Sequence, residues 1–148
     1  MKRILLILGL VILGIQFVRI DYSGPMVSIE TDFISMTNPP EEIEDILRSS
    51  CYDCHSNQTK YPWYSQIAPV SWWIADHIKE GREELNFSLW GTFSEKRKSK
   101  KLHEIIEEVE EGEMPLSNYL ITHSDAELSK EKSDQLIEWV KYLEIKKQ

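Results

Sequence analysis

The feature that most constrains this chain is a C-x-x-C-H run at residues 51–55, Cys51-Tyr52-Asp53-Cys54-His55, which contains both cysteines of the protein. The two thiols lie about one helical turn apart, and an imidazole follows directly. This is the attachment signature of a c-type haem, whose vinyl groups bond to the cysteines and whose iron binds the histidine. The sequence therefore predicts one covalent haem, with Cys51 and Cys54 as thioether sites and His55 as the proximal iron ligand.

A C-x-x-C pair also occurs in thioredoxin-like redox proteins and as half of a zinc site. A zinc site needs further Cys or His ligands at short spacing, whereas His77, His103 and His123 are scattered singly. A thioredoxin-like pair follows a strand-helix-strand pattern, and none precedes Cys51. The histidine next to the second cysteine favours haem attachment over both alternatives.

The N-terminus resembles an export signal. Lys2 and Arg3 precede an apolar stretch at residues 4–18, so residues 1–20 are expected to form a signal or a short membrane anchor. No small-x-small cleavage site follows, which favours an uncleaved anchor. By the positive-inside rule the basic end stays cytoplasmic, and the rest would lie in a bacterial periplasm, tethered to the inner membrane by residues 4–18.

Residues 21–38 mix Ser, Thr, Gly and Pro with isolated apolar residues, and this composition predicts a linker. The remaining residues, 39–148, have the length of one small domain. The chain carries 17 basic and 25 acidic residues, a net charge of −8. This acidity excludes nucleic acid as a partner and favours redox partner proteins with a basic docking surface.

Helical periodicity recurs through the domain, and no segment alternates as a strand would. The sequence therefore predicts an all-α fold, a small cytochrome c-like helical domain around one haem. Four helices are expected: from Pro39 or Pro40, capped by Asn38, up to Cys51; Val70 to Glu80, ended by Gly81; Leu102 to Val109, stopped by Gly112; and from the cap Ser129 through Leu143.

Met114 is the leading candidate for the second iron ligand. It follows the helix stop at Gly112 and precedes Pro115, which biases it to an extended loop that can present its thioether. The other methionines are the initiator and two in the expected linker. His77, on a helix rich in tryptophan, is the main rival, followed by His123, while His103 is expected at the surface. An open site is the remaining possibility.

Several strings together resemble one family closely. They are Cys51-Tyr52-Asp53-Cys54-His55-Ser56-Asn57, Tyr61-Pro62-Trp63-Tyr64, Ala68-Pro69-Val70-Ser71-Trp72-Trp73, Gly81-Arg82, Leu85-Asn86-Phe87-Ser88 and Gly112-Glu113-Met114-Pro115. From Pro39 to Val140 the chain is similar to the bacterial haem-binding domain family, small exported single-haem proteins related to c-type cytochromes. The resemblance implies thioether links at Cys51 and Cys54, His55 as axial ligand, and Met114 in the place of a cytochrome's Met-Pro pair. It assigns no reaction.

The function expected from these features is single-electron transfer by haem c, the iron alternating between Fe(III) and Fe(II) between His55 and Met114. Such a protein is an electron carrier rather than an enzyme. The alternative is a haem-based sensor or a peroxidase-like enzyme with an open distal site, although the sequence shows no distal His–Arg pair. A haem-bearing subunit of a larger membrane complex is a third possibility.

Overall fold

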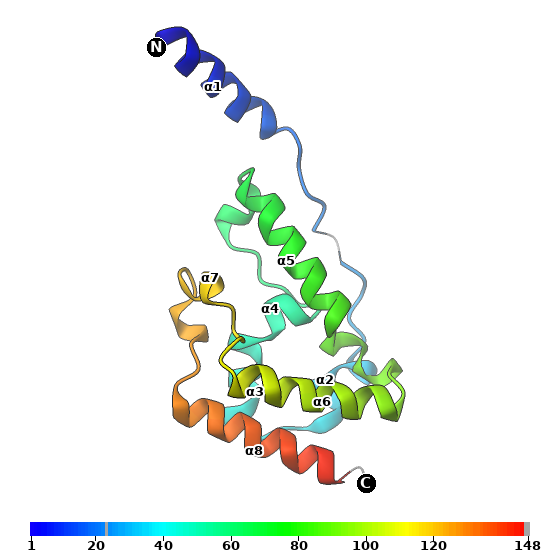
Figure 1. Ribbon diagram of the computed structural model, residues 1–148. Coiled ribbons are helices and arrows are strands. Elements are labelled where there is room, and N and C mark those ends of the chain that lie inside the picture. Colours follow the sequence, from blue (N-terminus) through cyan, green and yellow to red (C-terminus); the bar gives the residue numbers. More distant parts are fainter. Residues whose placement is uncertain (23, 147–148) are drawn as a thin grey trace.

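The computed structural model of the protein describes residues 1–22 and 24–146 (Figure 1). Ser23, in the expected linker, and Lys147 and Gln148, at the end of the expected domain, lie outside the described residues. The described residues form helices and no strand, which confirms the all-α prediction. In chain order the elements are α1 (Lys2–Ile15), η1 (Ile29–Thr31), α2 (Phe33–Thr37), α3 (Glu41–Ser50), α4 (Tyr52–His55), η2 (Trp63–Gln66), α5 (Val70–Glu84), η3 (Phe87–Thr92), α6 (Glu95–Glu110), α7 (Ser117–Leu120), η4 (Ser124–Ala126) and α8 (Lys130–Lys146).

The helices α6 and α8 pack side by side and run in opposite directions (Figure 1). Each buries residues four apart, which fall on one face of a helix: Leu102 and Ile106 in α6, and Leu136 and Val140 in α8. The helix α3 packs against α8 as well. The apolar periodicity that predicted these helices therefore forms the core of the domain.

An aromatic cluster joins α2 and η3 to this core. The ring of Phe33 lies 4.9 Å from that of Phe87 and 4.7 Å from that of Trp90, and all three side chains are fully buried. The prediction that residues 21–38 form a linker without secondary structure is therefore wrong for residues 29–37, which form η1 and α2. The Ser and Thr content hid a short helix whose burial depends on partners about 55 residues away.

The close contact between α4 and α5 depends on Gly81. A Cβ at this position would lie 3.0 Å from the Cys54 carbonyl oxygen, closer than ordinary van der Waals contact. The prediction that Gly81 ends a helix is wrong, because α5 continues to Glu84. This glycine serves the approach of two helices rather than a helix stop.

The capping predictions had mixed outcomes. Ser129 accepts a hydrogen bond from the Lys132 backbone N–H at 3.3 Å, which confirms it as the cap of α8. Gly112 has φ +75° just after α6, as expected of a stop. Asn38 does not cap α3. It instead adopts the left-handed conformation that ends α2, and its N–H bonds to the carbonyl of Ile34.

The first helix, α1, projects from one end of the domain (Figure 1). Its C-terminal end is fixed to the turn before α5: the Gln16 side-chain amide exchanges two hydrogen bonds with the backbone of Ala68, at 2.9 and 3.1 Å. The Trp72 indole N–H also donates to the carbonyl of Val18, at 3.1 Å. Within the described residues, no helix combines the length and the apolar character needed to cross a bilayer.

Candidate haem site

The C-x-x-C-H run occupies a single helical turn directly after α3. The carbonyl of Cys51 accepts hydrogen bonds from the backbone N–H groups of Cys54 (3.3 Å) and His55 (2.9 Å). Both thiols are free. The helix α3 therefore delivers the motif, as the sequence predicted: Cys51 is the cap residue between α3 and α4, and Cys54 and His55 lie within α4.

Both thiols are held in the neutral form. Burial raises the pKa of Cys51 to about 12, with a smaller contribution from neighbouring Cys54, and burial raises the pKa of Cys54 to about 11. A thioredoxin-like pair depends on the opposite shift, because the thiolate is its nucleophile. The electrostatics of the site therefore disfavour the dithiol alternative.

The imidazole of His55 is fixed by two backbone carbonyls. Its Nδ1 lies 2.8 Å from the oxygen of Gly81 and 3.1 Å from that of Leu85. Because a carbonyl only accepts, Nδ1 carries the proton and Nε2 presents its lone pair. Burial lowers the pKa of His55, which also favours the neutral ring. Metal-bound histidines are oriented in this way, so the donor set fits a haem iron bound at Nε2.

A cleft lies beside Cys54, between α5 and the segment that contains α7. Most of its walls are aromatic or apolar side chains, as in typical cofactor sites. Its lining includes Tyr61, Pro62, Tyr64, Trp73, Ile74, Ile78, Leu116 and Tyr119. Cys54 thus lies at a surface where the flat face of a porphyrin would find apolar contacts.

A hydrogen bond connects the motif to the far side of this cleft. The Tyr119 hydroxyl donates to the Asp53 carboxylate, at 3.0 Å, across 66 positions of the chain. Asp53 also accepts from the backbone N–H of Lys60, at 2.9 Å. Tyr119 thereby brings the segment that follows Met114 against α4. The sequence offered no signal for this pairing.

Met114 itself lies half-buried at the start of that segment. Its backbone N–H donates to the carbonyl of Glu108, at 3.2 Å, in the turn that ends α6. Two residues later Leu116 lines the cleft, whereas Met114 is not among the lining residues. The assignment of Met114 as an iron ligand stays a prediction.

The two rival histidines, His77 and His123, both line the cleft. Nδ1 of His77 donates to the carbonyl of Trp73, at 2.9 Å, and its Nε2 lies 3.5 Å from the amide nitrogen of Asn118. The ring of His123 stacks on Tyr119, with ring centres 4.0 Å apart. His103 is exposed and lies near Glu107, as expected of a surface residue.

Arg82 holds the loop that follows the motif. Its Nε donates to the carbonyl of Ser56 (2.8 Å) and one terminal nitrogen donates to the Thr59 hydroxyl (2.9 Å). A further set of bonds joins this loop to η3: the Asn57 N–H donates to the Ser88 hydroxyl, and the Asn86 amide donates to the Asn57 side-chain oxygen. These contacts fix the polypeptide that follows His55.

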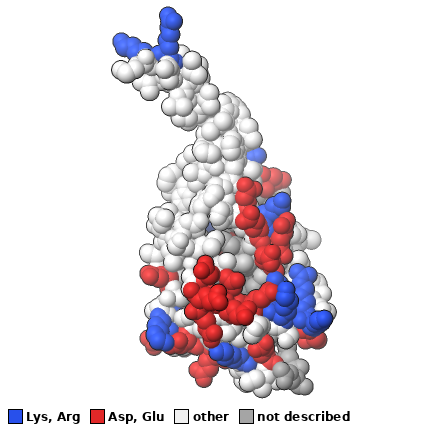
Figure 2. Space-filling model, in the orientation of Figure 1, with Lys and Arg blue, Asp and Glu red and all other residues white. Residues whose placement is uncertain are grey.

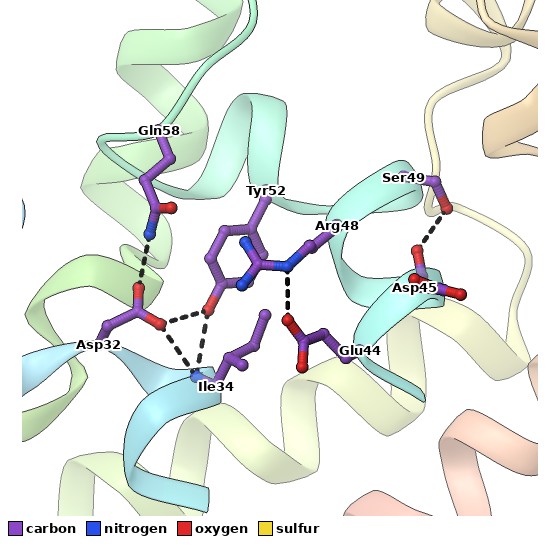
Figure 3. A network of polar contacts seen from close by, with 8 residues as sticks. All are labelled: Asp32, Ile34, Glu44, Asp45, Arg48, Ser49, Tyr52 and Gln58. Carbon is purple, nitrogen blue, oxygen red and sulfur yellow. Dashed lines mark hydrogen bonds and ion pairs between the residues drawn. The ribbon is translucent and has the colours of Figure 1, made fainter. Parts of the chain in front are cut away.

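A buried polar network anchors the other face of α4 (Figure 3). The Asp32 carboxylate accepts from the Tyr52 hydroxyl (3.1 Å), the Ile34 N–H (3.1 Å) and the Gln58 side-chain amide (2.9 Å). Asp32 is only 4% exposed and Tyr52 only 3%. Tyr52 lies within the motif, so the network links the haem-attachment turn to the start of α2. Sequence reasoning missed Asp32, because it lies in the expected linker.

The sequence matches the family model of the haem-binding domain over residues 10–142. This match spans most of the chain. The protein belongs to the haem-binding domain family. The match starts well before Pro39, where the resemblance was expected to begin, so this haem-binding domain includes α2 and its buried Phe33. No curated protein and no solved structure shows significant similarity to the chain.

Proposed function

We propose that this haem-binding domain is a monohaem c-type cytochrome that transfers single electrons on the periplasmic side of the bacterial inner membrane. One observation carries the proposal. His55 directly follows Cys54, its Nδ1 is committed to the carbonyls of Gly81 and Leu85, and its Nε2 is left to bind iron. When bound, the haem supplies a one-electron Fe(III)/Fe(II) couple.

The residues of this chain would hold and tune that group. Cys51 and Cys54 form the two thioether links, and the carbonyls of Gly81 and Leu85 keep the His55 ring in one orientation and raise its basicity. Met114 would supply the second ligand; the hydrogen bond from Tyr119 to Asp53 supports this role, because it holds the segment that follows Met114 near α4. Ligation by Met and His raises the potential relative to two histidines.

The tether and the partner are part of the proposal. Residues 4–18 hold the protein at the membrane, with Lys2 and Arg3 on the cytoplasmic side. At the C-terminal end of α6 an exposed acidic cluster precedes Met114, formed by Glu107, Glu108, Glu110, Glu111 and Glu113. A redox partner with a basic docking surface would be attracted to this cluster.

A second function has one observation in its favour. Polar groups of His77, Asn118 and His123 line the cleft beside Cys54, where they would be able to hydrogen-bond a small molecule on the iron. A haem-based sensor or a peroxidase-like enzyme with an open distal site would use them in this way. In that case Met114 is not a ligand.

Optical spectra of the ferric protein separate these functions. We expect Met114→Ala to abolish the weak near-infrared charge-transfer band of methionine-ligated haem, to leave the iron open or water-bound, and to lower the potential. Met26→Ala is the control, because Met26 is almost fully exposed. Conversion to high spin by His77→Ala, with Met114→Ala unchanged, would show His77 to be the ligand. An open site would be indicated if neither variant changed the spin state.

A further inference from the structure

Three stretches of the sequence without Lys, Arg, Asp or Glu come together at one end of the molecule. They are residues 4–18, 61–75 and 114–124. The Gln16 side chain joins the first stretch to the second at Ala68. The Tyr64 hydroxyl joins the second to the third, since it donates to Thr122 at 3.0 Å. Side chains far apart in the chain therefore share one end that carries almost no charge.

This apolar end, defined by residues 61–75, 114–124 and α1, exposes large hydrophobic side chains. Trp63 is 77% exposed and Ile121 is 82% exposed. Ile67, Val70 and Trp73 are also exposed, as are the apolar residues of α1. Monomeric soluble proteins rarely expose so many neighbouring apolar side chains, and a surface of this kind marks an interaction site.

The distribution of charge indicates which partner covers this end. Figure 2 shows basic atoms at the tip of α1 and then an almost uncharged surface, whereas acidic and basic atoms gather over the lower part of the domain. Tryptophan side chains at the border between an apolar zone and a polar one are typical of a membrane interface, and basic residues flanking an apolar helix favour anionic lipid. A protein partner would be expected to need a polar rim with charges.

We propose that the apolar end of the folded domain, and not α1 alone, lies against the surface of a lipid bilayer, with Trp63 and Ile121 in contact with lipid. The inference rests on the membrane tether proposed above. It also fixes an orientation: the end of the domain that carries α1 lies toward the membrane, and α8 lies at the end away from it (Figure 1).

Partitioning of the full-length haem-loaded protein onto vesicles of phosphatidylethanolamine and phosphatidylglycerol tests the proposal. We expect Ile121→Glu and Trp63→Glu each to lower the partition coefficient about tenfold or more, because a charge replaces an apolar side chain at the proposed contact with lipid. The matched control is Ile145→Glu, since Ile145 is 74% exposed on α8 at the opposite end, and it should leave partitioning unchanged. Haem absorbance of each variant checks the cytochrome function separately.

Equal partitioning of Ile121→Glu and Ile145→Glu would overturn the proposed orientation and leave the tether intact. Failure of the unsubstituted protein to bind vesicles would overturn both the proposed orientation and the proposed tether. A dimer in the absence of lipid that Ile121→Glu dissociates would assign this end to a second copy and would also overturn the proposal.

Hydroxyl-radical footprinting of the unsubstituted protein avoids any folding defect. Vesicles should protect Trp63 and leave Tyr142 of α8 reactive, and an unprotected Trp63 would overturn the proposed contact with lipid.

Discussion

Replacing Asp32 by alanine should destabilise the protein by about 2–4 kcal/mol. The substitution leaves the buried Tyr52 hydroxyl without its acceptor, at a cost of about 1–3 kcal/mol. It also removes the side-chain cap of α2, which contributes about 1 kcal/mol. The Ile34 N–H keeps a partner in the Tyr52 oxygen, 3.2 Å away, and this limits the loss.

Urea unfolding of the haem-loaded protein, followed by far-ultraviolet circular dichroism, measures the effect. The midpoint should fall while the slope of the free energy of unfolding against urea stays the same. Tyr52→Phe should lower the free energy of unfolding less, by about 1 kcal/mol, because Asp32 retains its hydrogen bonds to Ile34 and Gln58. The control is Asp45→Ala on the exposed face of α3, with a change within about 0.5 kcal/mol. An Asp32→Ala variant as stable as this control would refute the reasoning.

Two further predictions concern the contacts around α4. Gly81→Ala should destabilise the protein by up to about 2 kcal/mol in urea unfolding, because overpacking against Cys54 exceeds the gain in helix propensity. The control is Gly14→Ala, since open space surrounds Gly14. A Gly81→Ala variant more stable than the unsubstituted protein would contradict the close contact. Tyr119→Phe should cost about 1 kcal/mol at neutral pH. Burial and Asp53 raise the pKa of Tyr119 above its ordinary 10.0. The contribution of the Tyr119 hydroxyl to the free energy of unfolding is therefore complete below pH 10.0 and falls as the pH rises further. Urea titrations at alkaline pH check this. The hydrogen bond would be contradicted if the difference in free energy of unfolding between Tyr119→Phe and the unsubstituted protein did not shrink.

The sequence predicted those parts of the fold that depend on local patterns. The apolar spacing of Leu102 and Ile106 indicated α6, and the hydroxyl of Ser129 indicated the start of α8. Such signals are local because helix periodicity and capping involve residues three or four positions apart. The C-x-x-C-H run is equally local, which is why haem binding was accessible from sequence.

The parts that the sequence missed depend on contacts between distant segments. Phe33 belongs to the core only because Phe87 and Trp90 lie against it. A glycine such as Gly81 is typical of a helix stop, and its role in the contact between helices becomes visible only when α4 lies against α5. Asp32 and Tyr119 bond to the motif across 20 and 66 positions. No periodicity encodes pairs of this kind.

Covalent attachment of haem is the central claim, and acid–acetone extraction tests it most directly. The protein is matured in a host competent for cytochrome c assembly, denatured, and extracted, and the haem is then measured in the polypeptide and in the solvent. We predict that haem stays with the polypeptide, that Cys51→Ser and Cys54→Ser each leave at most one thioether link, and that the double variant releases all of its haem. Complete extraction of haem from the unsubstituted protein would contradict the account.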